Sequence, residues 1–405
     1  MKIRNPKSAI RNFLSGFLSL SFVFSFSQDS IFRLALILPF ETQSSAGKID
    51  EYFATKDVFS ANKIHLSDDA VAALDFYQGA LKALDSIQGI KIQLSVYDCW
   101  NSDSVTKELL KKNELKNQDV IIGAVNASNS KLVAEFCKKN KILNVQPFTP
   151  SKSLTTANAY HLKLVPTIDA HVDAMFNSIT DSFPGSNIII YTPDADNSIS
   201  VAQRFDSLFR DYNIMAEKKF TTALLNTKDM MLNGKKTTAA DQLKEGIKNI
   251  WIITAFDESF VNGNFRVLFE KNEKFDIAAY GMPTWLWGEN MRLDYVNRFN
   301  TRLTETFLVD SSKQETSEFI TRYRTEYHLA PSRNAFMGFD AMNFITQCLS
   351  EYGKDFLPQI TTQRYSGTAY KFDISKNTRG DEINYYENRH VNVFMVQDYL
   401  LRRVW

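Results

Sequence analysis

The chain has 405 residues, of which 44% are hydrophobic and 23% charged, with a formal net charge of +1. This length exceeds what one hydrophobic core comfortably supports, so we expect two domains. The low glycine and proline contents argue against long disordered tracts, and the near-neutral charge gives no reason to expect nucleic acid or an anionic membrane as a partner.

Residues 1–27 have the composition of a secretory signal peptide. Basic residues precede an apolar run over 13–24, and small serines stand just before Gln28. The run is too short and too rich in serine for a membrane span. We predict a cleavable signal peptide and an exported product, with an uncleaved anchor as the alternative. The basic residues are Lys2, Arg4, Lys7 and Arg11, and the serines are Ser25 and Ser27.

The chain contains three cysteines, Cys99, Cys137 and Cys348. An odd number allows at most one intramolecular disulfide, and two of the three stand in helical apolar patterns. We therefore predict buried free thiols. The spacing of cysteines and histidines matches no metal site, so we expect no metal and no cofactor.

Residues 31–98 predict one complete βαβ unit. The apolar run 31–39 suits a strand covered on both faces. Ser67 is a candidate N-cap, and apolar residues recur at helical spacing from Ala70 to Ile87. Gly89 ends this helix, and residues 90–98 form the return strand, which parallel pairing requires.

The loop over residues 40–66 is much longer than the ~2–6 residues of an ordinary βα loop. It leaves the carboxyl end of the first strand, which is where ligands bind in such sheets. The sequence leaves three interpretations open: a lid, a loop that docks a partner, and a solvated insertion.

Strands and helices continue to alternate after Asp98. The first lobe continues with a helix at 102–115, a strand at 119–123, a helix at 128–140 and a strand at 142–145. A second series repeats the plan. Its strands are expected at 159–164, 187–191, 216–220, 250–254 and 276–280, and its helices at 167–182, 199–212, 241–247 and 256–271. Helices at 313–330 and 334–352 follow, and residues 366–398 alternate like antiparallel strands joined by a turn.

Several segments resemble the type I periplasmic binding proteins, the branched-chain amino-acid receptor class. The resemblance rests on Leu36–Phe40, Phe76–Ala80, Ile121–Gly123 and Asn144–Pro147, and near the end on Gly338–Ala341, Gly367 and Val393–Val396. It covers essentially all of 31–398. It implies an α/β fold of two Rossmann-like lobes with parallel sheets and a ligand in the cleft between them. By this analogy lobe 1 is 31–160 plus 307–358, and lobe 2 is 161–306 plus 359–405.

Candidate binding residues follow the strands of both lobes, since loops at the carboxyl ends of parallel strands line the binding crevice. Lobe 1 offers hydroxyls and helix N–H groups for a carboxylate, and lobe 2 offers acids for an ammonium and aromatic walls. The candidates are Ser128, Asn129, Phe148, Thr149 and Ser151, with Tyr191, Asp194, Asp257 and Tyr280.

Each candidate also has a structural interpretation. Ser128 is a possible helix N-cap, and Asp257 with Glu258 stabilises a helix dipole without any ligand. Asp196 is an alternative to Asp194. Trp285 and Trp287 suit either a stacking platform or core packing.

No nucleophile elbow, phosphate-binding glycine loop or HExxH motif is present, so we expect no enzyme. The resemblance implies a periplasmic protein that captures a small polar ligand, an amino acid or short peptide, by hinge closure, and whose partner is an inner-membrane ABC transporter. The alternative is an envelope scaffold or regulator that uses the same fold to bind a protein such as a cell-wall synthase.

Overall fold

The computed structural model describes residues 22–24, 31–42, 66–227, 239–271 and 274–405.

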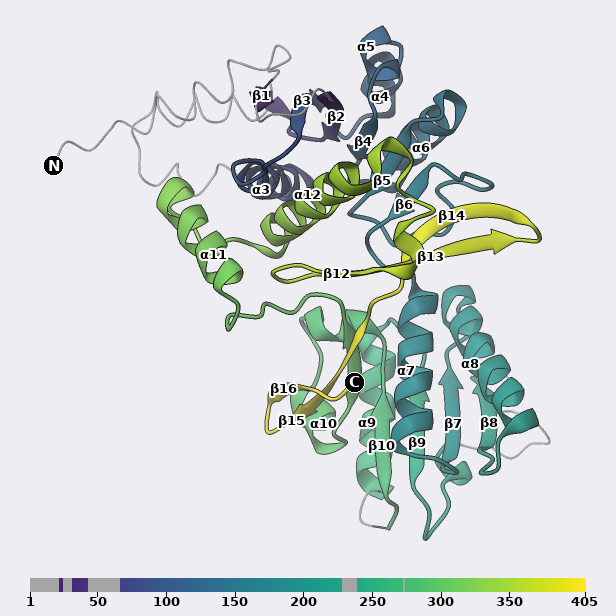
Figure 1. Ribbon diagram of the computed structural model, residues 1–405. Coiled ribbons are helices and arrows are strands. Elements are labelled where there is room, and N and C mark those ends of the chain that lie inside the picture. Colours follow the sequence, from purple (N-terminus) through teal and green to yellow (C-terminus); the bar gives the residue numbers. More distant parts are fainter. Residues whose placement is uncertain (1–21, 25–30, 43–65, 228–238, 272–273) are drawn as a thin grey trace, which may run out of the picture. The chain divides into compact units, whose positions relative to one another are not determined.

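These residues form two compact units, each with a mostly parallel sheet and helices packed on it (Figure 1). The first unit spans Met1–Val165 and Phe307–His390, and the second spans Pro166–Thr306 and Val391–Trp405. The structure therefore has the mixed α/β fold that the sequence predicts.

The first sheet has the strand order β1-β3-β2-β4-β5-β6-β14-β13-β12. The strands from β3 through β14 in this order run parallel, and β1, β13 and β12 pair antiparallel. β2 pairs with β3 from Ile31 opposite Lys91 to Leu38 opposite Asp98, which confirms the predicted βαβ unit. The strands are β1 (Phe22–Phe24), β2 (Ile31–Leu38), β3 (Lys91–Asp98), β4 (Val120–Gly123), β5 (Leu143–Gln146), β6 (His161–Lys163), β12 (Arg364–Ser366), β13 (Lys371–Arg379) and β14 (Glu382–Asn388).

Successive residues of β2 enter two different cores, because side chains alternate across a strand. Leu34 and Leu36 join one core together with side chains of α3, α11 and α12, and Ala35 and Ile37 join the other with side chains of α5 and α6. The helices of this unit are α3 (Asp68–Leu84), α4 (Asp103–Leu109), α5 (Asn113–Lys116), α6 (Ala127–Asn140), α11 (Gln314–Tyr327) and α12 (Arg333–Tyr352).

Two glycines let α3 and α12 approach closely. A Cβ atom on Gly79 would overlap the carbonyl of Ala335, and one on Gly338 would overlap the carbonyl of Phe76. Both glycines belong to segments on which the family resemblance rests.

The helix N-cap predicted at Ser67 is confirmed, since its Oγ accepts a hydrogen bond of 3.1 Å from the Ala70 N–H.

Asp340, on α12, is fully buried and holds the turn that leads into β13. Its carboxylate accepts hydrogen bonds from the N–H groups of Thr368, Ala369 and Tyr370 and from the Thr368 hydroxyl, at 2.8–2.9 Å. Burial raises the pKa of Asp340 to about 6, and these donors oppose that shift. Gly367 leaves room for the carboxylate, which a Cβ atom would overlap.

The second sheet has the order β16-β15-β11-β10-β9-β7-β8. Its strands from β8 to β11 run parallel, and β15 and β16 close one side antiparallel. The strands are β7 (Asn187–Thr192), β8 (Thr221–Asn226), β9 (Asn249–Ile253), β10 (Ile277–Tyr280), β11 (Arg302–Glu305), β15 (Asn392–Gln397) and β16 (Leu400–Arg403). The helices are α7 (Ile168–Ser182), α8 (Asp196–Met215), α9 (Glu258–Lys271) and α10 (Leu293–Arg298), with 3₁₀ turns at η3 (Ala239–Gln242) and η4 (Pro283–Trp287).

The division between the units differs from the sequence-based assignment in two places. Residues 161–164 were expected to open the second lobe, but β6 pairs with β5 in the first sheet. Residues 359–390 were assigned to lobe 2, but β14 pairs with β6, and Tyr386 is buried in the first core. An apolar alternation shows that a segment is a strand, and it does not show which of two sheets the strand joins.

Three local expectations also need correction. The helix predicted over 102–115 is two short helices, α4 and α5. The strand expected at 216–220 begins only at Thr221, and the helix expected at 241–247 is the 3₁₀ turn η3.

The three cysteines are free and buried, which confirms the thiol prediction. Residues 43–65 of the long loop lie outside the described residues, as does most of the predicted signal segment. Within that segment, β1 pairs antiparallel with β3, with Phe22 opposite Leu94. No helix among the described residues is long and apolar enough to cross a membrane.

Candidate ligand-binding loops of the two sheets

Asp98, at the carboxyl end of β3, organises the first loops at this edge of the first sheet. Its carboxylate accepts hydrogen bonds from the N–H groups of Glu41, Thr42 and Trp100 and from the Thr42 hydroxyl, at 2.9–3.2 Å. These bonds tie the start of the β2 loop to the end of β3. Trp100 remains 38% exposed beside them.

The loop after β4 begins α6, and the expectation that Ser128 caps this helix is wrong. The cap is Asn126, whose side chain accepts 2.8 Å from the Asn129 N–H. Ser128 lies within the first turn and donates 2.7 Å to Asp103. Asn129 is buried, and its amide donates 2.8 Å to the Thr106 hydroxyl. Ser128 is thus the exposed hydroxyl here, while Asn129 joins α6 to α4.

Gln146 holds the loop after β5. Its amide group donates to the Ala124 carbonyl at 3.0 Å and the Ser130 hydroxyl at 2.7 Å, and its oxygen accepts 2.8 Å from the Phe148 N–H and 3.3 Å from the Thr149 N–H. One buried side chain therefore connects the loops after β4 and β5, so the structure brings these two groups of predicted residues together.

The side chains of this loop lie at its partly exposed surface. The Phe148 ring packs against Phe76, with 4.9 Å between ring centroids. The Thr149 hydroxyl accepts 3.3 Å from the Ser151 N–H, and the Ser151 and Ser153 hydroxyls lie 3.0 Å apart. Both predicted hydroxyls thus belong to a fixed turn.

Lys163, which was not predicted as a site residue, contacts the backbone of the same loop. Its side chain is fully buried, its ammonium donates 2.5 Å to the Ser151 carbonyl, and it lies 4.0 Å from the centre of the Tyr385 ring. The pKa of Lys163 is lowered to about 8, mainly because the side chain is buried. Repulsion from Lys152 also lowers this pKa, whereas attraction to Glu387 raises it. A lysine inside a buried strand was the signal that could have identified it.

In the second unit, Tyr191 lies at the end of β7, and Asp257 follows the neighbouring strand β9. Tyr191 is 7% exposed and stacks on Phe260 of α9, with ring centroids 5.3 Å apart, and burial raises its pKa. Asp257 is exposed and accepts 2.7 Å from the Phe260 N–H, so it caps α9. Asp194 is exposed in the loop after β7. The structure therefore places Tyr191 and Asp257 against the same helix turn.

Tyr280, in contrast, is fully buried at the end of β10. Its hydroxyl lies 3.2 Å from that of Ser178, and burial raises its pKa to about 12. Trp285 is also a core side chain, with its indole N–H donating 2.9 Å to the Ala255 carbonyl, whereas Trp287 is 61% exposed. The two tryptophans do not share one environment, so they form no joint platform.

The described residues include no group of three histidine, cysteine, aspartate or glutamate side chains placed to hold a metal ion. His161 is buried and His171 is half-buried, and desolvation lowers their pKa values to about 3 and about 4. The chemistry that these loops offer is therefore hydrogen bonding and charge: hydroxyls and N–H groups in the first unit, and a carboxylate beside an aromatic ring in the second.

Two units with mostly parallel sheets and polar loops after their strands have the architecture of the type I periplasmic binding proteins. The family model for the receptor family ligand binding region matches residues 80–385, about three quarters of the chain. The chain belongs to this family, and the resemblance to type I periplasmic binding proteins is confirmed.

Solved structures agree with this assignment. A Rhodospirillum rubrum protein described as a branched-chain amino acid ABC transporter is 13% identical, with a TM-score of 0.62 over 93% of this chain and 100% of its own. An ABC transporter substrate-binding protein from Desulfitobacterium hafniense, in complex with Leu, is 16% identical, with a TM-score of 0.52 over 93% and 100%.

Haemophilus influenzae LpoA is 12% identical, with a TM-score of 0.56 over 94% of this chain and 60% of its own. At these identities the likenesses establish the fold. No curated protein matches the sequence significantly.

Proposed function

We propose that this protein is an exported, non-enzymatic solute-binding protein that captures a small polar ligand, an amino acid or short peptide, between its two units by hinge closure. Family membership over residues 80–385 is the observation that carries this proposal. A structural relative in complex with Leu supports the ligand class. The expected location is the periplasm, and the expected partner is an inner-membrane ABC transporter.

The loops supply the chemistry that such a ligand needs. Ser128, Thr149 and Ser151 offer hydroxyls to a carboxylate, and Asp257, or Asp194, offers a carboxylate to an ammonium. The Tyr191 ring offers an apolar wall. Asn129 and Tyr280 are buried with internal partners, so we assign them to positioning rather than contact.

Native mass spectrometry of protein purified without denaturation tests the proposal. We expect a non-covalent adduct with the mass of an amino acid or short peptide, and calorimetry with the identified compound should show one site per chain. The absence of any adduct, together with no heat from any of the common amino acids, would contradict the solute-binding function.

A protein-binding scaffold or regulator of cell-wall synthesis is the second candidate, and the fold likeness to LpoA favours keeping it. A substitution at Tyr191 distinguishes the two functions. Replacing Tyr191 with Ala should weaken solute binding in a solute receptor. If no solute binds the wild-type protein, and chemical crosslinking in the envelope joins both wild type and Tyr191→Ala to the same protein, the scaffold function is supported.

Export with removal of the signal peptide can be measured directly. Protein recovered from the envelope should lack residues 1–27, because the basic and apolar regions precede small residues. Intact-mass analysis would show a chain that begins at Gln28. Detection of the full-length chain there would support the uncleaved anchor instead.

A further inference from the structure

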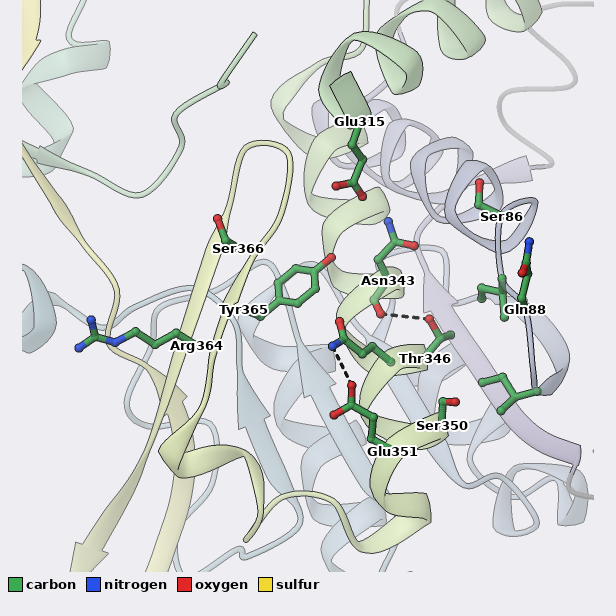
Figure 2. Close-up of a pocket in the computed structure, with 13 residues that line it drawn as sticks. Ser86, Gln88, Glu315, Asn343, Thr346, Ser350, Glu351, Arg364, Tyr365 and Ser366 are labelled. Atoms are coloured by element: carbon green, nitrogen blue, oxygen red, sulfur yellow. Dashed lines mark hydrogen bonds between the residues drawn. The ribbon is translucent and has the colours of Figure 1, made fainter. Parts of the chain in front are cut away.

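The first unit contains a polar hollow of about 570 Å³, which shares no residue with the loops described above. This volume is within the ~300–1,000 Å³ typical of small-molecule pockets. Its walls are α12, the start of α11, the edge strand β12 and the turn between α3 and β3 (Figure 2). The lining residues central to the argument are Glu315, Asn343, Gln347, Glu351 and Tyr365, and Ser350 lies beside them.

Three polar groups from three different elements point into this hollow. Figure 2 shows the Glu315 carboxylate, the Asn343 amide and the Tyr365 hydroxyl directed toward one another around a shared space. Among the described residues, none of these three groups has a hydrogen-bond or ion-pair partner. Polar groups gathered at a concave surface without internal partners are available to a ligand.

The Tyr365 ring is fixed, so its hydroxyl has a defined position. It stacks on Phe372 at 5.6 Å and also packs against Phe344 at 5.3 Å between ring centroids. The ring therefore packs against protein, and its hydroxyl is directed into the hollow. Burial and the negative charges of Asp340 and Glu315 raise the pKa of Tyr365, so it remains a neutral donor and acceptor at physiological pH.

The charge of the lining is negative. The Glu351 carboxylate accepts 2.9 Å from the Gln347 amide and has no cationic partner among the described residues. Arg364 is the cation in the lining, but it pairs with Asp373 at 3.1 Å and points away from the hollow in Figure 2. Two carboxylates with no counter-ion among the described residues disfavour an anionic ligand and favour hydroxyl and ammonium donors.

Several lining residues come from α12. Asn343, Gln347 and Ser350 lie on one helix face, because residues three and four apart are neighbours. They span roughly 10 Å at 1.5 Å per residue. Ser86 and Gln88, from the turn between α3 and β3, also line the hollow. A ligand there meets repeated hydrogen-bonding groups rather than one anchor.

We propose that this hollow binds a hydroxyl-rich small molecule of the sugar class, with preference for one that carries an ammonium group. Carboxylates accept hydrogen bonds from hydroxyl and ammonium groups, while the amides and the tyrosine hydroxyl both donate and accept, which matches a sugar ring. The site is independent of the proposed solute function, since the two share no residue.

Calorimetry of the full chain with D-glucosamine as the probe tests this inference. We expect binding at millimolar concentrations or below, weaker binding of D-glucose, and no binding of gluconate, whose carboxylate would face Glu315. Replacing Glu315 with Gln should weaken glucosamine binding at least ~10-fold, which corresponds to about 1.4 kcal/mol. Tyr365→Phe removes only the hydroxyl, keeps the ring contacts, and should weaken binding several-fold.

Glu318→Gln is the matched control, because Glu318 lies on the same helix α11, is exposed, and pairs with Gln314 rather than facing the hollow. It should bind like wild type, and thermal melts should show all variants folded. Failure of glucosamine to bind, or binding unchanged in both Glu315→Gln and Tyr365→Phe, would overturn the site. Equal or tighter binding of 1,4-diaminobutane, which has no hydroxyl, would overturn the sugar class.

Discussion

Asp257 combines a helix cap with a charge, and two substitutions separate these roles. Asp257→Asn keeps a cap acceptor for the Phe260 N–H but removes the charge, whereas Asp257→Ala removes both. If Asp257 binds a ligand ammonium that hinge closure buries, each variant should weaken ligand binding at least ~30-fold, because leaving that buried ammonium unpaired costs about 2–5 kcal/mol. Calorimetry with the solute identified by mass spectrometry measures this.

Stability should distinguish the same two variants. Loss of an N-cap costs about 1 kcal/mol, so urea unfolding should show Asp257→Ala destabilised by that amount and Asp257→Asn close to wild type. Wild-type ligand affinity in Asp257→Asn would mean that Asp257 acts only as a helix cap.

Ser151→Ala removes one hydroxyl among several donors, so it should reduce the free energy of ligand binding by only ~1 kcal/mol.

Burial of Lys163 makes the unfolding free energy of the first unit depend on pH at alkaline pH. Its pKa is lowered to about 8 in the folded protein from 10.5 in the unfolded chain. Between these values the unfolded chain binds the extra proton, so the unfolding free energy rises with pH through this window. The gain is present above pH 10.5 and is lost as the pH falls through about 8.

Comparison with Lys163→Met isolates this contribution, since methionine fills a similar volume without a charge. The stability of wild type relative to Lys163→Met should rise by about 2 kcal/mol between pH 7.5 and pH 10, at ~1.4 kcal/mol per pKa unit with some relaxation. Urea unfolding of both proteins at the two pH values measures this. A difference that does not change with pH would show that the Lys163 ammonium is not desolvated.

At the scale of elements, the contact between α3 and α12 depends on two glycines. Gly338→Ala would place a methyl group against the backbone carbonyl of Phe76, which cannot move without shifting α3. Overpacking of a rigid contact costs typically 1–3 kcal/mol and occasionally more, so we expect at least about 2 kcal/mol of destabilisation. Chemical denaturation of the variant measures it.

Gly263→Ala provides the matched control within α9. A Cβ atom at Gly263 would meet no atom within 4 Å, so alanine adds helix propensity without a clash. This variant should be stabilised by up to ~1 kcal/mol. Equal effects of Gly338→Ala and Gly263→Ala would mean that helix propensity, and not the contact between α3 and α12, decides the outcome.

At the scale of the whole molecule, alternation of apolar runs predicted the two α/β units, because a buried parallel strand and an amphipathic helix each leave a local signature. It did not predict that β14 pairs with β6, since sheet membership depends on contacts more than 200 residues apart in the sequence. The loops that carry Ser128 and Thr149 were identified by their position after strands. The hydrogen bonds of Gln146 and the burial of Lys163 depend on tertiary packing.

A ligand held by both units should protect both of them from hydrogen exchange. Ligand at 100 times its Kd stabilises the bound state by about 2.7 kcal/mol, and amides that open only when the ligand is released gain that protection. We expect slower exchange in residues 147–153 of the first unit and in residues 191–196 and 254–260 of the second. Exchange measured by mass spectrometry, with and without the identified solute, tests this.

The Asp257→Asn variant serves as the control, because at the same ligand concentration it should lose the protection in both units together. Coupled loss is expected if closure depends on simultaneous contacts, since a ligand can shift an equilibrium only by its differential affinity for the two states. Residues 86–90, which border the polar hollow, should exchange at the same rate with and without this solute. Protection confined to one unit, in wild type as in the variant, would contradict hinge closure and leave a ligand bound to a single lobe.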